Sequence, residues 1–371
     1  MNALILWSLF VLLNVFSDSE AQPQRCKTPN NEPGSCIPMS ECSFIQQILS
    51  KSVLFNNDVK YIQGAQCGNY QNDVLVCCAK SKTGPATSAL SVKMGTKTLL
   101  PVAPACGVQY SDRIVGGEQT GITDFPWTAR IQHYDHRHND YAFHCGGSLI
   151  NERYVLTAAH CISGIPASWS ISAVRLGEWD VLTDPECKDG DNDCYDPVQD
   201  IEVEKAIVHE KFINTRLQVH NDIALLRLAR EAQMSQTVVP ICLPLGESFA
   251  KRRYDGLKMF VAGWGQTEFG GNSRYKLVVG VNGIAEQRCR RQYLTANIND
   301  RQICAGEVAG KDSCKGDSGG PLMDVIVAGN EVIHYLAGVV SFGKQCGKEG
   351  VPGVYTKVNR FGDWILKHLE P

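Results

Sequence analysis

The cysteines of this chain restrict its fold more than any other feature, because their number and spacing indicate covalent cross-links. Sixteen cysteines occur among 371 residues, an even set that is typical of proteins folding in an oxidising compartment. Six of them crowd into residues 26–78, a module too small to bury much core, so disulfides would supply stability. The adjacent Cys77 and Cys78 must bond to different partners, because neighbours rarely satisfy disulfide geometry. Spacing alone does not choose the pairing, and zinc is not indicated because this segment has no histidine.

The first residues are typical of a secretory signal peptide. The run from Ala3 to Phe16 is apolar but too short to span a bilayer, and polar and small residues follow it. We expect cleavage after Ala21, with Ser17 and Ser19 as alternative sites; a buried N-terminal helix is the alternative interpretation. No later segment is apolar enough for a membrane anchor, so the mature protein is expected to be secreted into an extracellular fluid.

Residues 79–105 have the composition of a mobile linker. They are rich in Lys, Ser, Thr, Gly, Pro and Ala and contain no acidic or aromatic side chain, so they cannot build a core. The formal net charge of −3 does not indicate nucleic-acid binding. No Asn-x-Ser/Thr sequon for glycosylation occurs.

Three distant segments together carry the residue types of a serine hydrolase. Residues 312–321 place Ser318 between Gly-Asp and Gly-Gly, with an aspartate upstream. Such Gly-rich turns are usually structural when they stand alone. His160 in Thr-Ala-Ala-His-Cys and Asp222 in Asn-Asp-Ile-Ala-Leu-Leu complete the order His, Asp, Ser, which catalytic triads are known to use. A core histidine and a strand cap are the structural alternatives for these two residues.

With these motifs, residues 114–371 resemble the trypsin-type serine proteases. The resemblance implies an all-β, chymotrypsin-like double antiparallel β-barrel with a short C-terminal helix near Trp364. Short apolar runs such as Tyr154-Val155-Leu156 separated by turn residues agree with it. It implies that His160 is the general base, Asp222 its orienting carboxylate and Ser318 the nucleophile. The backbone N–H groups of Gly316 and Ser318 would form the oxyanion hole.

The same resemblance implies a substrate class. Asp312 would lie at the base of the primary pocket, where a carboxylate pairs with a long cationic side chain, and Gly343 and Gly353 would leave the pocket walls open. Cleavage after Arg or Lys is therefore expected. Phe342 stands where the family usually has Trp, so the neighbouring subsite is expected to differ.

The segment Ser111-Asp112-Arg113-Ile114-Val115-Gly116-Gly117 resembles the activation site of these proteases. Cutting after Arg113 would free the amine of Ile114, which in the family pairs with Asp317. Without that partner the buried carboxylate would favour another loop arrangement, so the chain is expected to be a zymogen. Its activator would be trypsin-like, with self-activation as the alternative.

Residues 26–78 resemble the clip domain of arthropod extracellular proteases, whose role is binding or regulation. The resemblance pairs Cys106 with Cys242, which would keep the clip attached after cleavage, and leaves Cys187 and Cys194 to each other. The other implied pairs are Cys26 with Cys77, Cys36 with Cys67, Cys42 with Cys78, Cys145 with Cys161, Cys289 with Cys304 and Cys314 with Cys346. The predicted layout is a signal peptide at 1–21, a clip domain at 26–78, a linker at 79–105, a light-chain end with the activation site at 106–113 and a protease domain at 114–371.

An acidic stretch around the Cys187–Cys194 pair resembles the calcium loop of the protease fold. In that loop Glu178 and Glu186 would give carboxylates to calcium, and Asp180 and Thr183 carbonyl oxygens. A solvated acidic loop without metal is the alternative.

Four histidines surround the charged segment from Tyr134 to Tyr141. They predict substrate contact more than zinc binding, because they lie in an insertion between two expected strands. The four are His133, His136, His138 and His144.

The hypothesis is a secreted clip-domain serine endopeptidase of an arthropod haemolymph cascade. Its expected substrates are prophenoloxidase, a Toll-ligand precursor or another protease zymogen, and serpins are its expected inhibitors. A catalytically silent homologue that acts as a binding cofactor is the main alternative. A digestive trypsin is disfavoured, because gut digestion has no need of a clip domain or linker.

Overall fold

The computed structural model divides the chain into two compact units, Met1–Ser91 and Val92–Pro371. The expected signal peptide, Arg113, Ile114, Asp312, Glu186 and the Cys314–Cys346 pair lie outside the described residues. The described residues are 25–42, 44–45, 61–70, 73–79, 99–109, 118–185, 187, 194–266, 271–307, 316–328, 331–344 and 350–371. None of their helices is long and apolar enough to cross a membrane.

The first unit is a small disulfide-bonded sheet. Its four strands lie in the order β1-β2-β4-β3. Among its described residues the core is a small cluster of Cys42, Ile45, Ala65 and Val76, with Ile37, Met39, Tyr61, Ile62 and Cys78 packed against it. Three disulfides, Cys26–Cys77, Cys36–Cys67 and Cys42–Cys78, therefore hold it. Its elements are β1 (Arg25–Lys27), β2 (Pro33–Pro38), the 3₁₀ turn η1 (Met39–Glu41), β3 (Gln66–Tyr70) and β4 (Asp73–Ala79).

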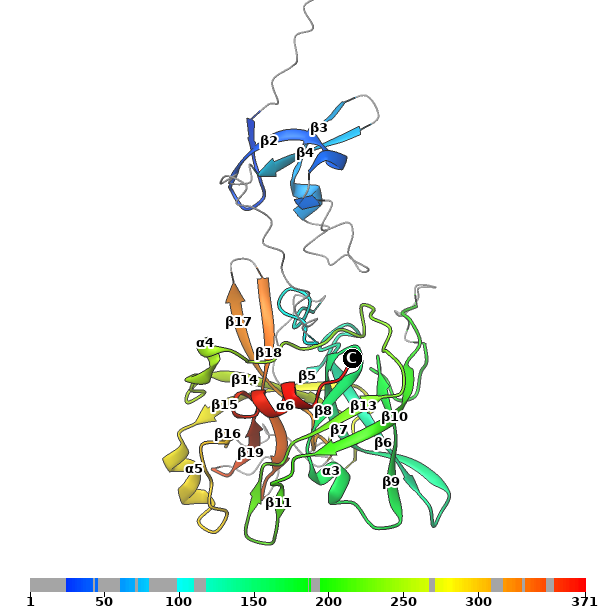
Figure 1. Ribbon diagram of the computed structural model, residues 1–371, viewed down its shortest axis with the longest axis vertical. Helices are drawn as coiled ribbons and strands as arrows, with labels where there is room; N and C mark the ends of the chain where they lie inside the picture. The colour runs from blue at the N-terminus through cyan, green and yellow to red at the C-terminus, as the bar shows by residue number, and fades with distance from the viewer. Residues whose placement is uncertain are drawn as a thin grey trace, which may run out of the picture. The chain divides into compact units, whose positions relative to one another are not determined.

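The second unit contains two antiparallel barrels (Figure 1). The first closes in the order β10-β13-β8-β7-β6-β9. Its strands are rich in Val, Ile and Leu, which favour pleated structure, and all four residues of β8 are buried. The strands are β6 (Thr128–Asp135), β7 (Asp140–Asn151), β8 (Tyr154–Thr157), β9 (Trp169–Leu176), β10 (Gln199–Val208) and β13 (Ala224–Leu228), with α3 (His160–Ser163) and the hairpin β11 (Ile213–Asn214) and β12 (Val219–His220) beside them.

The second barrel follows the order β14-β17-β18-β19-β16-β15, and a β14–β15 pairing closes it, with β5 at the edge of β15. The predicted double-barrel fold is thus confirmed. The C-terminal helix α6 buries Ile365, and Phe361 and Leu369 at its two ends are buried as well, as the apolar spacing predicts. The elements are β5 (Glu118–Gln119), α4 (Glu247–Ala250), β14 (Lys258–Gly263), β15 (Leu277–Ile284), α5 (Glu286–Gln292), β16 (Gln302–Gly306), β17 (Pro321–Ala328), β18 (Glu331–Phe342), β19 (Pro352–Lys357), η2 (Val358–Arg360) and α6 (Gly362–His368).

Four further disulfides join cysteines among the described residues of the second unit, and each joins a pair that the family resemblance implies. They are Cys106–Cys242, Cys145–Cys161, Cys187–Cys194 and Cys289–Cys304.

Residues 99–105, which belong to the predicted linker, lie within the second unit. Leu99 and Leu100 pack on the core of the barrels, and the carbonyl of Leu99 accepts a 2.7 Å hydrogen bond from Asn151. Composition predicts a linker because residues 79–105 have no acidic or aromatic side chain. The two leucines nevertheless gain free energy by leaving water, and the nearby Cys106 disulfide fixes the segment.

The buried His334 lies where this segment joins the barrel. Its Nδ1 is 3.1 Å from the carbonyl of Gly107, and its ring packs against Phe125 and Trp127. Its Nε2 has no hydrogen-bond partner among the described residues. Burial therefore lowers the pKa of His334 to about 4.

We expect stability to fall between pH 6.5 and about 4 because of His334. In this pH window the imidazole is protonated in the unfolded chain but neutral in the folded protein. The free energy of unfolding therefore decreases as the pH falls. A shift of this size corresponds to about 3 kcal/mol. Urea unfolding at several pH values should show that His334→Phe removes most of this loss, whereas His136→Phe, an exposed control, leaves it. An unchanged pH profile in His334→Phe would contradict the assignment.

Candidate active site

Strand pairing brings His160 and Asp222 together although 62 positions separate them. β13 pairs antiparallel with β8, with Ala224 opposite Thr157. The chain leaving β8 and the chain entering β13 therefore meet at one edge of the sheet. His160 Nδ1 lies 2.8 Å from Asp222 Oδ2, and the backbone N–H of His160 donates to Oδ1 at 2.9 Å. Two contacts to one carboxylate fix both the backbone and the ring of the histidine.

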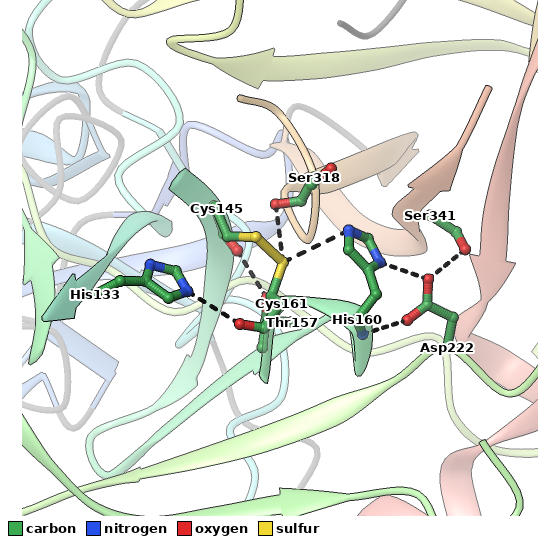
Figure 2. The surroundings of a disulfide bond; sticks show 9 residues. His133, Cys145, Thr157, His160, Cys161, Asp222, Ser318 and Ser341 are labelled. Carbon is green, nitrogen blue, oxygen red and sulfur yellow. Dashed lines mark hydrogen bonds and ion pairs between the residues drawn. A yellow bond between two sulfur atoms is a disulfide. The ribbon is translucent and has the colours of Figure 1, made fainter. Parts of the chain in front are cut away.

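The Asp222 side chain is buried, with 1% of its surface exposed, against 22% for His160. Ser341 donates its hydroxyl to Asp222 Oδ2 at 2.5 Å, and Thr356 donates to the Asp222 carbonyl at 2.7 Å (Figure 2 shows Ser341). Sequence reasoning missed both supports. Ser341 occurs in the segment Ser341-Phe342-Gly343, which we considered only for its glycine, and no sequence motif indicates Thr356 as a partner of Asp222.

Ser318 lies on a tight turn that both barrels hold. The Gly146 N–H donates to the Ser318 carbonyl at 2.7 Å, and Gly319 donates to Val340 at 2.9 Å. Gly319 has φ +79°, and a Cβ there would lie 2.2 Å from Thr157 Oγ1. Only glycine fits this position, because it tolerates positive φ and needs no space for a side chain.

The disulfide sulfur of Cys161 lies between the serine and the histidine (Figure 2). It is 3.6 Å from the Ser318 carbonyl oxygen and 3.8 Å from His160 Nε2. Among the described residues, the Ser318 hydroxyl makes no hydrogen bond to His160. Such a bond often forms only when substrate binds.

The turn also places Gly316 and Asp317. Gly316 has φ +99°, a conformation that glycine adopts easily. Asp317 Oδ1 accepts a 2.9 Å hydrogen bond from the Gly265 backbone, and a Cβ on Gly265 would lie 2.3 Å from Asp317 Oδ2. The partner expected for Asp317 after cleavage, Ile114, lies outside the described residues.

The described part of the structure includes two of the three residues predicted for the primary pocket, Gly343 and Gly353. Gly343 is exposed just beyond β18, and a Cβ there would meet nothing within 4 Å. Gly353 lies in β19 opposite Ala305 of β16. Asp312 lies outside the described residues.

In the described part of the predicted calcium loop, arginine side chains pair with the carboxylates of Glu178 and Asp180. Glu178 Oε2 contacts guanidinium nitrogens of Arg130 and Arg175 at 3.2 and 3.3 Å. Asp180 binds both Arg274 Nε and NH2, at 2.7 and 2.6 Å, and this pairing keeps the pKa of Asp180 below its ordinary value. The Glu178 carboxylate predicted as a calcium ligand is thus paired with arginine, whereas the carbonyl ligands expected from Asp180 and Thr183 stay a prediction.

Three of the predicted histidines make separate polar or stacking contacts, although the rings of His133 and His144 also meet edge to face with centroids 5.5 Å apart. His133 is buried, with Nε2 3.0 Å from the Cys161 carbonyl, and His144 stacks on Trp169 with ring centroids 4.4 Å apart. His138 Nδ1 is 2.6 Å from Asp135, at the β6–β7 turn. The expected loop insertion is thus largely an extension of two paired strands, with Tyr134 opposite Tyr141. No cluster of these histidines with metal-ligand spacing occurs among the described residues.

Comparisons with known proteins assign the two units. The trypsin family model matches residues 114–365. The chain belongs to the trypsin family of serine proteases. The model of the regulatory CLIP domain of proteinases matches residues 26–78. This clip-domain protease is therefore a serine endopeptidase by family.

Its relatives include insect proteins of the same layout. CLIP domain-containing serine protease B4 of Anopheles gambiae is 44% identical over 350 residues, which cover 93% of this chain and 92% of that protein. Melanization protease 1 of Drosophila melanogaster is 40% identical over 390 residues, covering 97% of each chain. The crystal structure of the Drosophila Grass clip serine protease of the Toll pathway matches with a TM-score of 0.61 and 31% identity, covering 93% of this chain and 96% of that one.

Proposed function

We propose that the protein is a secreted zymogen of a serine endopeptidase, activated by cleavage after Arg113, that cuts protein substrates after Arg or Lys. The observation that carries this proposal is the contact between His160 Nδ1 and the buried Asp222, beside the turn that bears Ser318. A serine hydroxyl needs a base with a pKa near neutrality, and histidine supplies it.

The proposed steps follow from these positions. His160 Nε2 takes the proton of Ser318 as its oxygen attacks the scissile carbonyl, and later gives that proton to the leaving amine. Asp222 keeps the proton of Nδ1 in place and stabilises the imidazolium. The backbone N–H groups of Gly316 and Ser318 bind the oxyanion. Water then releases the acyl group from Ser318 by the same proton transfers in reverse.

The cascade assignment rests on relatives. Melanization protease 1 and the Grass protease of the Toll pathway share both units with this chain. We therefore propose an extracellular immune cascade in haemolymph, with a phenoloxidase precursor, a Toll-ligand precursor or a downstream protease zymogen as substrate. Serpins are the proposed inhibitors, and an upstream trypsin-like protease the activator.

Controlled cleavage tests the proposal. We expect arginyl peptide hydrolysis to rise at least about a hundredfold when the chain is cut after Arg113, because a misplaced oxyanion donor alone costs this much. N-terminal sequencing should identify Ile114 as the new end, and Arg113→Gln, treated identically, should stay inactive. Absence of peptide hydrolysis despite a confirmed Ile114 terminus would favour the alternative that the protein is a catalytically silent binding cofactor. Incubating the cut enzyme with each purified precursor then identifies the substrate, and failure on all three would remove the cascade assignment.

A further inference from the structure

The end of β18 leaves an open strand edge beside the His160–Asp222 pair. On one side this strand pairs with β19, through Val340 opposite Tyr355 and Phe342 opposite Val354. On the other side its pairing with β17 stops at Val339. Within the described ranges no strand covers this second edge beyond Val340, and Gly343 faces open space. An extended peptide can add to such an edge as an antiparallel strand.

The position of Ser341 sets the register of an added peptide. The Val340 carbonyl accepts a 2.9 Å hydrogen bond from Gly319, the residue after Ser318, and Ser341 touches Asp222. Ser341 is therefore the first residue of the open edge beside the catalytic residues, and we place the scissile residue of a substrate opposite it. An antiparallel partner then advances by one residue at each step. The second residue from the scissile bond meets Phe342, the third Gly343 and the fourth Lys344.

Lys344 lies two residues beyond the end of β18 at Phe342, and a shared neighbour places the two side chains on one side of the segment. Both contact Tyr293: the Phe342 ring is edge-on at 5.8 Å, and Lys344 Nζ lies 4.9 Å from the Tyr293 ring centroid. The buried Tyr293 is itself fixed by a 2.5 Å hydrogen bond from its hydroxyl to the Pro352 carbonyl. The result is an exposed ammonium above a rigid aromatic floor.

The charges around this ammonium favour an acid. Lys344 Nζ donates one hydrogen bond to the carbonyl of Gln292, the last residue of α5, and an ammonium has three donors. The helix α5 contains Glu286 and three arginines, of which Arg290 pairs with Glu286 and Arg288 with Glu307, so these five groups carry a net charge of +1. An incoming carboxylate would therefore meet a positive surface.

We propose that Lys344 selects an acidic side chain at the fourth residue from the scissile bond, counted back from and including the cleaved Arg or Lys. This inference rests on the proposed function. It makes Lys344 a specificity residue outside the catalytic machinery. The alternative is that Lys344 serves only to cap the C-terminus of α5.

Matched peptides test the preference. The cut enzyme is given Glu-Ala-Gly-Arg and Gln-Ala-Gly-Arg reporter amides, and Ala-Glu-Gly-Arg and Ala-Gln-Gly-Arg as a control at the third position. We expect kcat/KM to favour Glu over Gln by about two- to fivefold at the fourth position, the range of an exposed ion pair, chiefly through KM. The third position should show a smaller ratio, and the fourth-position ratio should shrink as salt is added.

Three variants assign the effect. Lys344→Met should bring the fourth-position ratio to about one, and Lys344→Glu should favour Gln, whereas Lys251→Met, at the end of α4, should keep the wild-type ratio. The ratio of kcat/KM for the Glu and Gln peptides is measured with one enzyme preparation, so it does not depend on the fraction of folded protein. A ratio that persists in Lys344→Met, or that is absent from the wild type, overturns the inference. If no peptide is cut at all, the proposed function fails instead.

Discussion

Ser318→Ala is expected to lower kcat for arginyl substrates about a millionfold, the loss known for nucleophile removal from triads of this type. Without the hydroxyl no acyl-enzyme forms, and only binding and oxyanion contacts remain. The fold should be unaffected. The Ser318 hydroxyl makes no hydrogen bond among the described residues, whereas its carbonyl, which the substitution keeps, holds Gly146 at 2.7 Å.

The measurement is hydrolysis of an arginyl reporter after cleavage at Arg113, with thermal unfolding run in parallel. Ser170→Ala, which removes a hydroxyl from β9 that contacts His136, is the matched control and should keep full activity. If Ser318→Ala retained more than about one per cent of the activity, another nucleophile would have to be sought.

Asp222→Asn should lower kcat by about four orders of magnitude at neutral pH. The carboxamide would present an N–H to His160 Nδ1, which forces the proton onto Nε2, the nitrogen that must accept from Ser318. The surroundings can adapt, because the Ser341 hydroxyl, now a donor to Oδ2, can accept instead. The substitution should therefore act on the tautomer of His160 and leave the fold in place.

Asp324→Asn provides the comparison for that variant. Asp324 is also buried and pairs with Arg252, but it has no contact with the site, so activity per folded molecule should be kept. Activity of Asp222→Asn close to the wild type would show that the 2.8 Å contact with His160 is not needed for the reaction.

The residues that local sequence reveals are those whose chemistry is tied to a short motif. His160, Asp222 and Ser318 each lie in a recognisable segment, and the apolar spacing of Phe361, Ile365 and Leu369 predicts α6. The supports of Asp222 could not be predicted this way. Ser341 lies 119 positions from Asp222 in the sequence and Thr356 lies 134 positions from it. These residues come together only when the chain folds into the barrels.

The ion pairs of Glu178 and Asp180 are a second feature that the local sequence does not predict. The oxygen-rich segment at Glu178 and Asp180 predicts a cation, and the cations that it contacts are the guanidinium groups of Arg130, Arg175 and Arg274. Arg130 lies 48 positions from Glu178, and Arg274 lies 94 positions from Asp180. No local sequence pattern therefore predicts these pairs.

The Cys106–Cys242 disulfide, together with the docked segment around Gly107, determines what a cut at Arg113 would produce. Gly107 donates to the Pro240 carbonyl and accepts from the His334 backbone, each at 2.8 Å, so the peptide before the cut has its own attachment to the barrel. The mature enzyme would gain the mass of one water molecule and lose none of its residues. Any surface that captures the first unit would then hold one catalytic unit per molecule. Release of that unit would require both reduction of the Cys106–Cys242 bond and undocking of the segment around Gly107.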